Sequence, residues 1–364
     1  MNRLFPLPIY TFFKISSKYG GVTFKGLKNL FPWILKTMVF EPLRWMELAL
    51  YNKKIKNHKM EKDPIFVLGF YRSGTTYTHQ LMRKDDRLGY HTNFQMIFPE
   101  IMLGSERFLS PFFNFICRFF NLQDPIHRKQ MSFNDPGEED GAMTTSLNIK
   151  GSQWGYFFPK KMIEHFRKYV LFEDLTESEI EDWKSEMKLI HKKISIANKG
   201  KRLVLKSPPN TARIKLLLSM YPNAKFIFIH RDPYTVFASN QRFWKVTSKI
   251  YALGENKSVD VNAIILDTYS EIMKKYLLEK DLIPEGQLIE IPYKELVEKP
   301  LETTRKMYEI LGLEDFSYIE EKLKTYIQSQ KSFVQLKHEL PDEERDSVTK
   351  ACAPYIEHWQ YPLS

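Results

Sequence analysis

The chain has 364 residues, of which 43% are hydrophobic and 14% aromatic, so it can bury a large core. It has only two cysteines, Cys117 and Cys352, which excludes a disulfide framework and a cysteine-rich metal site. Its net charge of +10 favours anionic partners such as phosphorylated small molecules, nucleic acid or a membrane surface.

The N-terminal region, residues 1–60, is predicted to be mostly helical and amphipathic. Its most apolar stretch, residues 30–51, is interrupted by charged side chains, so it falls short of the roughly 18 apolar residues of a membrane span. These interruptions are Lys36, Glu41, Arg44 and Glu47. Residues 1–17 lack a signal-peptide pattern, and we therefore expect a cytoplasmic protein whose basic, aromatic N-terminal region could contact a membrane surface.

From residue 64 onward, short apolar runs alternate with helical stretches. Residues 64–70 form an apolar run with Gly69 near its end, as expected for a buried parallel strand. Helices are expected at residues 75–82 and 93–122. The capping-box pattern from Thr176 to Glu179 predicts the start of a long helix that ends by Gly200.

Further strands are expected at residues 202–206, 225–230 and 287–291, separated by helices near residues 211–221 and from Pro233. Strands separated by helices indicate an α/β fold with a central parallel sheet flanked by helices. No linker or repeat divides the chain, so we expect one domain over residues 1–364, with the N-terminal helices packed on it. In such sheets, ligands bind at the carboxyl ends of the strands.

The first strand leads into a glycine-containing loop, Gly69-Phe70-Tyr71-Arg72-Ser73-Gly74-Thr75-Thr76-Tyr77. A turn of this kind aims backbone N–H groups at an anion, and the dipole of the following helix adds positive potential. Ser73, Thr75 and Thr76 add hydroxyl donors, and Arg72 adds a full charge. The run resembles a Walker A loop, but Thr75 stands at the lysine position, which disfavours nucleoside triphosphate chemistry.

The third strand also ends in a potential anion site, His230-Arg231-Asp232-Pro233, and the helix that follows carries Ser239. An arginine at a strand end can bind a phosphate through two hydrogen bonds. Ser239, two turns along the helix, can face the same anion.

Taken together, these motifs resemble those of the sulfotransferase family, in its broad bacterial-type branch. The loop resembles the family's 5′-phosphosulfate loop, and Arg231 with Ser239 resembles its 3′-phosphate motif. Leu205-Lys206-Ser207-Pro208, Ile291 to Pro300, and Ile310 to Leu313 are similar to later family segments. The resemblance covers about residues 64–313. It implies a P-loop-like three-layer fold, with extra helices at the N-terminus and on the acceptor side.

The resemblance also implies a reaction. The family transfers a sulfuryl group from 3′-phosphoadenosine-5′-phosphosulfate (PAPS) to a hydroxyl, without a metal, and leaves 3′-phosphoadenosine-5′-phosphate (PAP). By the resemblance, Arg72 contacts the donor as the family's loop lysine does, and Lys206 faces the sulfuryl group. The remaining donor-binding residues that it implies are Ser73, Gly74, Thr75, Thr76, Tyr77, Arg231, Ser239 and Tyr293.

The acceptor hydroxyl needs a general base, and many family members supply a histidine where this chain has Asn210. The acidic segment Pro136-Gly137-Glu138-Glu139-Asp140 resembles an acidic stretch of this branch of the family. It offers Glu138 or Glu139, because a partly buried carboxyl can acquire a suitable pKa. His79, on the helix after the loop, is the rival candidate.

Several aromatic and apolar side chains favour a lipid-like or aromatic alcohol as the small-molecule acceptor over a charged glycan or nucleic acid. They are Phe94, Met96, Phe98, Trp154, Tyr156, Phe157 and Phe158. The same residues fit an ordinary helix core equally well. Two other functions stay open: a nucleotide kinase or NTPase, and a catalytically silent nucleotide- or membrane-binding module. In the tail, Lys331, Lys337 and His338 are either donor contacts or surface.

Overall fold

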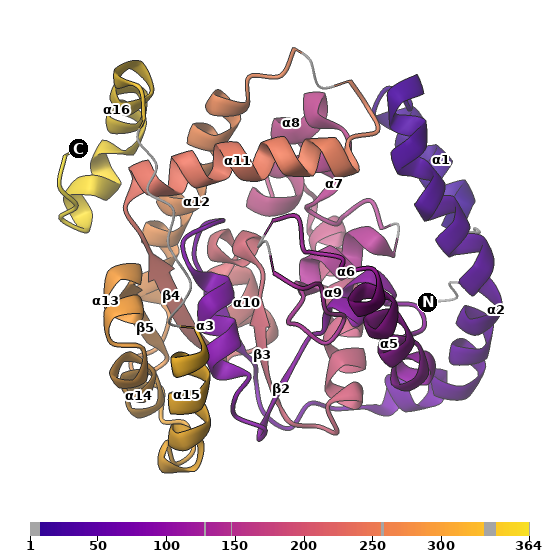
Figure 1. Cartoon of the computed structure of the whole chain (residues 1–364), viewed down its shortest axis with the longest axis horizontal. Helices are drawn as coiled ribbons and strands as arrows, with labels where there is room; N and C mark the ends of the chain where they lie inside the picture. The colour runs from indigo at the N-terminus through magenta and orange to yellow at the C-terminus, as the bar shows by residue number, and fades with distance from the viewer. Residues whose placement is uncertain (1–7, 127–128, 147, 256–257, 331–339, 364) are drawn as a thin grey trace. The chain divides into compact units, whose positions relative to one another are not determined.

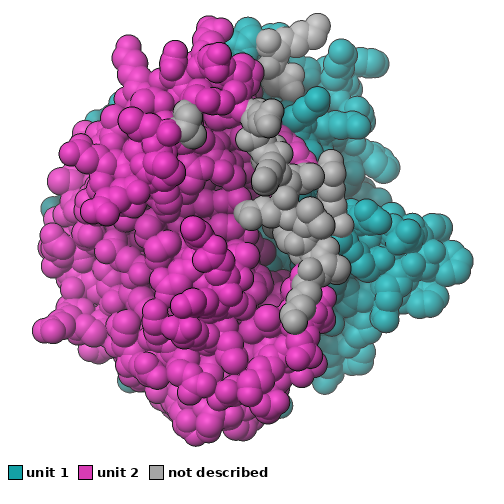
Figure 2. Space-filling view, turned by 60° about the vertical axis from the view of Figure 1, so that its left-hand side comes forward, with its two compact units in different colours: residues 1–60, 91–200, 243–260 teal, residues 61–90, 201–242, 261–364 magenta. Residues whose placement is uncertain are grey.

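A computed structural model describes residues 8–126, 129–146, 148–255, 258–330 and 340–363. The chain divides into two compact units (Figure 2). Unit 1 comprises residues 1–60, 91–200 and 243–260, and unit 2 comprises residues 61–90, 201–242 and 261–364. That the whole chain acts as one domain stays a prediction.

Unit 2 contains a sheet of five parallel strands in the order β2-β3-β1-β4-β5 (Figure 1). The strands are β1 (Ile65–Leu68), β2 (Leu88–Tyr90), β3 (Arg202–Lys206), β4 (Lys225–His230) and β5 (Leu288–Pro292). The central strand β1 is buried along its whole length, as its unbroken apolar run requires. The α/β class and the central parallel sheet are therefore confirmed.

The helices of unit 2 follow the strands in the alternation that the sequence predicts. They are α3 (Thr75–Met82), α10 (Ile214–Met220), α12 (Val261–Glu279), α13 (Tyr293–Glu298), α14 (Pro300–Ile310), α15 (Ser317–Ser329) and α16 (Asp342–His358). Helix α11 (Pro233–Tyr251) begins in unit 2 and runs on into the residues of unit 1. Side chains from β1, β4 and β5 form a buried cluster with α14 and α15, including Ile227, Ile291 and Met307.

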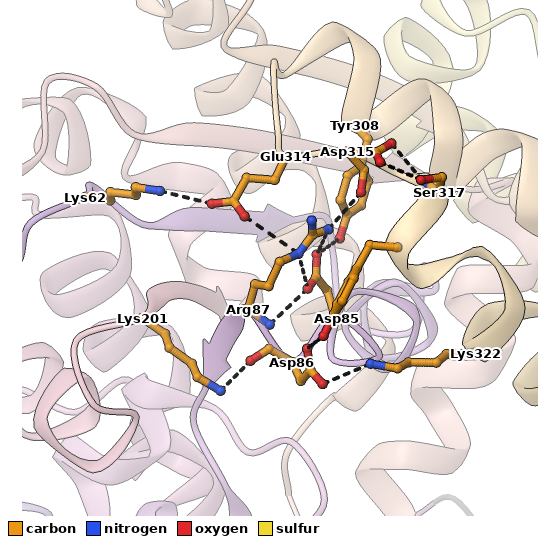
Figure 3. Close-up of polar contacts among 11 residues, drawn as sticks. Lys62, Asp85, Asp86, Arg87, Lys201, Tyr308, Glu314, Asp315, Ser317 and Lys322 are labelled. Atoms are coloured by element: carbon orange, nitrogen blue, oxygen red, sulfur yellow. Dashed lines mark hydrogen bonds and ion pairs between the residues drawn. The ribbon is translucent and has the colours of Figure 1, made fainter.

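A polar network joins residues 85–87, which precede the short strand β2, to α14 and to the loop between α14 and α15 (Figure 3). Arg87 donates through Nε and Nη2 to the two carboxylate oxygens of Asp85, at 2.8 and 2.7 Å, and Tyr308 donates to the same carboxylate at 2.9 Å. Arg87 also reaches the carbonyl oxygen of Asp315 at 3.0 Å. Because Asp85 is almost fully buried, these bonds satisfy a charge that would otherwise be costly.

Unit 1 is built largely from helices. They are α1 (Pro8–Lys18), α2 (Leu27–Asn57), α4 (Asn93–Ile97), α5 (Met102–Phe119), α6 (Glu139–Thr145), α7 (Trp154–Phe157), α8 (Met162–Phe166) and α9 (Glu177–Ala197). The capping box predicted before α9 is present, with Thr176 and Glu179 each bonding the other's backbone N–H. Within the described part of the chain, no helix is both long and apolar enough to cross a bilayer.

Candidate active site

The register of the sheet brings four predicted site segments to one edge of unit 2. Val67, near the end of β1, pairs with Lys206 at the end of β3 and with Ile227 on β4. His230, the last residue of β4, pairs with Pro292. Arg231 and Tyr293, which follow those two residues, therefore leave the sheet side by side, as parallel pairing dictates.

The loop after β1 depends on two glycines with positive φ. Gly69 has φ of 141°, and an added Cβ there would lie 2.5 Å from the carbonyl oxygen of Ile229. Gly74, which precedes α3, has φ of 111°, and an added Cβ would lie 2.2 Å from Cδ2 of Tyr293. Only glycine fits both the backbone conformation and the close approach at these positions.

The hydroxyl residues of the loop divide into inner and outer positions. Ser73 and Thr75 are buried, and Ser73 donates to the carbonyl oxygen of Phe70 at 2.7 Å. Thr76 and Tyr77 are partly exposed. Burial, together with the neighbouring Tyr326 and Tyr293, raises the pKa of Tyr77 to about 12, so its phenol remains a neutral hydrogen-bond donor.

Helix α11 holds the loop through adjacent residues. Asn240 donates from Nδ2 to the carbonyl oxygen of Tyr71 at 3.0 Å. Arg72, whose φ is 70°, donates from Nε to Oγ of Ser239 at 3.1 Å. The arginine of the first motif therefore lies against the serine of the second, a contact that the spacing along the sequence does not reveal.

Arg231 completes this cationic group. Its Nη1 donates to the carbonyl oxygen of Arg72 at 3.4 Å, and its guanidinium lies 4.4 Å from the centroid of the Tyr293 ring. Burial lowers the pKa of Arg231, and Tyr293 and Asp232 partly offset this effect. A guanidinium stays protonated even so, and one that is partly removed from water gains from an anionic ligand.

The other cation predicted from the resemblance, Lys206, is largely buried at the carboxyl end of β3. Beyond it, Thr211 joins the following segment to the phosphate loop, because its Oγ1 accepts from the N–H of Gly69 at 2.8 Å. Asn210 is buried and accepts from Nη1 of Arg213 at 3.2 Å, so its amide has a structural partner.

The acidic segment lies in unit 1, at the start of α6. Glu138 is the N-cap residue and is partly exposed, and its carboxylate accepts from Nε2 of Gln153 at 3.4 Å. Glu139 is fully buried, and so is Asp140, whose carboxylate accepts from the Ser152 hydroxyl. The residue before Glu138 must be glycine, because a Cβ on Gly137 would lie 2.8 Å from the carbonyl oxygen of Thr92.

The model of the sulfotransferase family matches residues 64–317 of this chain, which include every strand and the whole phosphate loop. This chain belongs to the sulfotransferase family. The match confirms the resemblance read from the two phosphate motifs, and membership makes the protein a transferase. Among the residues that the structure describes, no cluster of three or more histidine, cysteine, aspartate or glutamate side chains could hold a metal ion.

Two relatives of this sulfotransferase, from Mycobacterium bovis and Mycobacterium tuberculosis, are named omega-hydroxy-beta-dihydromenaquinone-9 sulfotransferase Stf3. Each is 26% identical over 325 residues, which is 89% of this chain and 82% of the relative. Among solved structures, sulfotransferase STF9 from Mycobacterium avium gives a TM-score of 0.73 at 15% identity, covering 100% of this chain and 99% of that one. STF1 from Mycobacterium tuberculosis gives 0.68 at 20% identity, over 95% and 91% of the two chains. These structures support the P-loop-like three-layer fold.

The rival base, His79, is fully buried in α3 of this sulfotransferase. Its ring meets the Tyr90 ring edge-on, with centroids 6.3 Å apart. The geometry is that of a packing residue, and its role as a base stays a prediction.

Sequence reasoning missed one histidine beside the acidic segment. His91 follows β2, is fully buried, and accepts the N–H of Gly137 on its carbonyl oxygen at 2.8 Å. Burial lowers its pKa to about 3, so the ring is neutral at neutral pH. Strand β2 has only three residues, and one of them is Gly89, so the sequence does not predict a strand there. Without that strand, nothing in the sequence marks His91 as a residue at a strand end.

Most of the apolar residues considered for an acceptor pocket belong to the core. Phe94 and Phe98 lie in one buried cluster with Ile101, and Trp154, Phe157 and Phe158 lie in another with Ile15 and Leu30. Tyr156 is buried against Phe243 and Trp244, and Met96 is partly exposed. The tail residues Lys331, Lys337 and His338 lie outside the described residues.

Proposed function

We propose that this sulfotransferase transfers a sulfuryl group from PAPS to the hydroxyl group of an apolar, lipid-like acceptor. The observation that carries the proposal is the meeting of the two phosphate motifs. Arg72 bonds Ser239 at 3.1 Å, and Arg231 bonds the backbone of Arg72 at 3.4 Å. Because the two motifs contact each other, one ligand that carries two phosphates on a single adenosine can bind both.

Each motif has a distinct task in holding the donor. The backbone N–H groups from Ser73 to Thr76, at the start of α3, would bind the 5′-phosphate. The hydroxyl groups of Thr75 and Thr76 would add hydrogen-bond donors. Arg231 and Ser239 would bind the 3′-phosphate. Tyr293 lies between Gly74 and Arg231, so its ring can pack beside the adenosine that joins the two phosphates.

Catalysis then depends on positioning and on positive charge. When bound, the donor supplies the sulfuryl group, whose bond to the phosphate oxygen breaks as the acceptor oxygen bonds to sulfur. Arg72 and Lys206 would stabilise the negative charge that develops on the oxygens around sulfur and on the leaving phosphate. Lys206 is largely buried, and the attraction between a cation and the negative charge that develops in the reaction is stronger where less water surrounds it.

The proton of the acceptor hydroxyl would pass to a carboxylate of the acidic segment. Glu138 is the stronger candidate, because its side chain is partly exposed whereas that of Glu139 is fully buried. A general base must come within hydrogen-bond distance of the proton that it removes. Glu139 and Asp140 would then stabilise the start of α6, where negative charge complements the helix dipole.

The apolar acceptor is supported by the relatives. Their name gives a hydroxylated dihydromenaquinone as the substrate of proteins that are 26% identical to this one. We infer that this protein acts on a hydroxyl of the same broad chemical class, an alcohol on a largely hydrocarbon molecule.

The test is an assay of the purified full chain with PAPS and a panel of acceptors. The panel contains a long-chain primary alcohol, a hydroxylated prenyl quinone, a phenol and a polysaccharide, and mass spectrometry detects PAP and the sulfated product. We expect transfer to the apolar alcohols, at a rate that EDTA leaves unchanged. Transfer to the polysaccharide alone would overturn the acceptor class. Mg-dependent hydrolysis of ATP without any PAP formation would overturn the donor.

A further inference from the structure

Helix α2 of unit 1 carries apolar side chains on its exposed side as well as on the side that packs in the core. Its exposed side chains are mainly apolar: Leu27, Phe31, Leu35, Met38, Val39, Trp45, Met46 and Leu50. At 100° per residue, these eight positions fall within an arc of about 140° on one side of the helix. We name this side the outer face of α2. A surface helix normally turns such a row of residues toward the core.

Two charged residues of the same stretch, Glu47 and Lys36, point the other way, into unit 1. Glu47 is buried, forms an ion pair with Lys193 at 2.6 Å, and accepts the N–H groups of Leu103 and Gly104. Lys36 donates to the carbonyl oxygen of Thr145 at 3.0 Å and lies 3.7 Å from the carboxylate of Glu100.

The remaining two charges of this stretch, Glu41 and Arg44, satisfy each other: Nε of Arg44 donates to Glu41 at 2.9 Å. The Arg44 guanidinium also lies 4.9 Å from the centroid of the Trp45 ring. None of the four charged side chains is exposed, so the exposed surface from Phe31 to Leu50 is apolar over a length of about 30 Å at the helical rise of 1.5 Å per residue.

Both ends of the outer face are basic. Lys25 and Lys28 are exposed at its start, and Lys53, Lys54 and Lys56 are exposed at its end. Among the described side chains of α1 and α2, no acidic side chain is exposed, because Glu47 is buried and Glu41 is partly buried beside Arg44. An apolar stripe bounded by lysines fits a lipid surface with anionic headgroups, because the stripe can enter the acyl boundary while the lysines meet phosphates.

A second copy of the chain is a poorer occupant. Because both ends of the outer face carry lysines, two helices packed face to face would bring lysines against lysines in either the parallel or the antiparallel direction. Like charges at such close range oppose association. The charge pattern therefore favours an anionic bilayer over a homodimer.

We propose that the outer face of α2 docks this protein on the surface of a membrane that contains anionic lipids. The helix lies in the plane of the interface, and the side that carries Lys36 and Glu47 is held against unit 1. This inference does not depend on the proposed donor or reaction. A protein docked on a membrane would meet a hydrocarbon-rich acceptor there, because such a molecule dissolves in the bilayer.

The test is sedimentation of the full chain with vesicles of phosphatidylcholine containing phosphatidylglycerol, compared with pure phosphatidylcholine. We expect binding to the anionic vesicles and at least tenfold weaker binding of Met38→Glu. The matched control is Leu278→Glu on α12, because Leu278 and Met38 are exposed to 70% and 67%. Equal binding of both variants and the wild type would overturn the proposal. So would a dimer in light scattering that Met38→Glu converts to a monomer without any vesicle binding.

A measurement on the unaltered outer face guards against misfolding of a variant. Trp45 lies on the face and is partly exposed, so lipids with brominated acyl chains should quench its fluorescence. The contribution of Trp45 is obtained by subtracting the fluorescence of Trp45→Phe from that of the wild type. Quenching of that difference signal supports docking through α2. Vesicle binding without any quenching of Trp45 would place the contact elsewhere and refute the proposal.

Discussion

Gly74 offers a test of how the donor site is assembled. Its φ of 111° is one that L-residues rarely adopt, and a Cβ would lie 2.2 and 2.6 Å from Cδ2 and Cε2 of Tyr293. Gly74→Ala therefore adds two costs. Backbone strain contributes ~1–3 kcal/mol, and displacement of a packed ring contributes ~1–3 kcal/mol more.

Gly200→Ala separates these costs. Gly200 has φ of 77°, and nothing lies within 4 Å of its added Cβ, so an alanine there meets strain without a clash. We expect both variants to unfold at lower urea concentration than the wild type, with Gly74→Ala the less stable of the two.

The functional readout is the affinity for PAP, measured by titration calorimetry. Because the clash in Gly74→Ala displaces Tyr293, which packs against the guanidinium of Arg231, we expect at least tenfold weaker binding of PAP, or about 1.4 kcal/mol. Gly200→Ala should bind PAP like the wild type. If a folded Gly74→Ala protein bound PAP with wild-type affinity, the contact between the loop and Tyr293 would have no part in holding the donor, and this prediction would be wrong.

The remaining predictions concern a phosphate contact, the base and the polar network of unit 2. Arg231→Ala should weaken PAP binding by about 10- to 100-fold in calorimetry, since a charge-assisted hydrogen bond contributes ~1.5–3 kcal/mol; unchanged affinity would contradict the assignment. Glu138→Gln should lower kcat by about 100-fold or more with PAP binding intact, whereas Glu139→Gln should mainly lower the unfolding temperature; wild-type turnover in both would exclude the acidic segment. Burial alone would raise the pKa of Asp85, but hydrogen bonds, chiefly from Arg87, hold it below its ordinary value. The ionised Asp85 carboxylate therefore stabilises the folded protein above the pKa that it has in the unfolded chain, about 3.9. This stabilisation is lost as pH falls through the lower pKa that Asp85 has in the folded protein. The gap in unfolding free energy between wild type and Asp85→Asn, ~3 kcal/mol at pH 7, should narrow below about pH 4, and a gap independent of pH would contradict this.

The strands and the phosphate loop are predictable from local sequence, because a buried parallel strand needs an unbroken apolar run and its turn needs glycine. Residues 65–68 meet both conditions, because Gly69 follows them, and residues 226–229 meet the first. The contact of Arg72 with Ser239 is not predictable in this way. It depends on how β1 and β4 pair and on the direction of α11, which holds Tyr71 through Asn240.

The orientation of α2 was also beyond sequence reasoning. In the sequence, Lys36 and Glu47 interrupt an apolar stretch. The sequence alone therefore does not show that one side of the helix exposes only apolar side chains along this stretch. Their partners, Glu100 and Lys193, lie far along the chain, and only the folded structure shows that these charges face inward. The acidic segment was found by its resemblance to a stretch of the family, but the difference between the partly exposed Glu138 and the buried Glu139 required the structure.

The most direct test of the donor site is a crystal structure of the full chain grown with PAP. The account predicts the 5′-phosphate at the backbone N–H groups of residues 73–76 and the 3′-phosphate between Arg231 and Ser239, with the base beside Tyr293. PAP bound away from either motif, or one motif occupied while the other contacts only solvent, would contradict it.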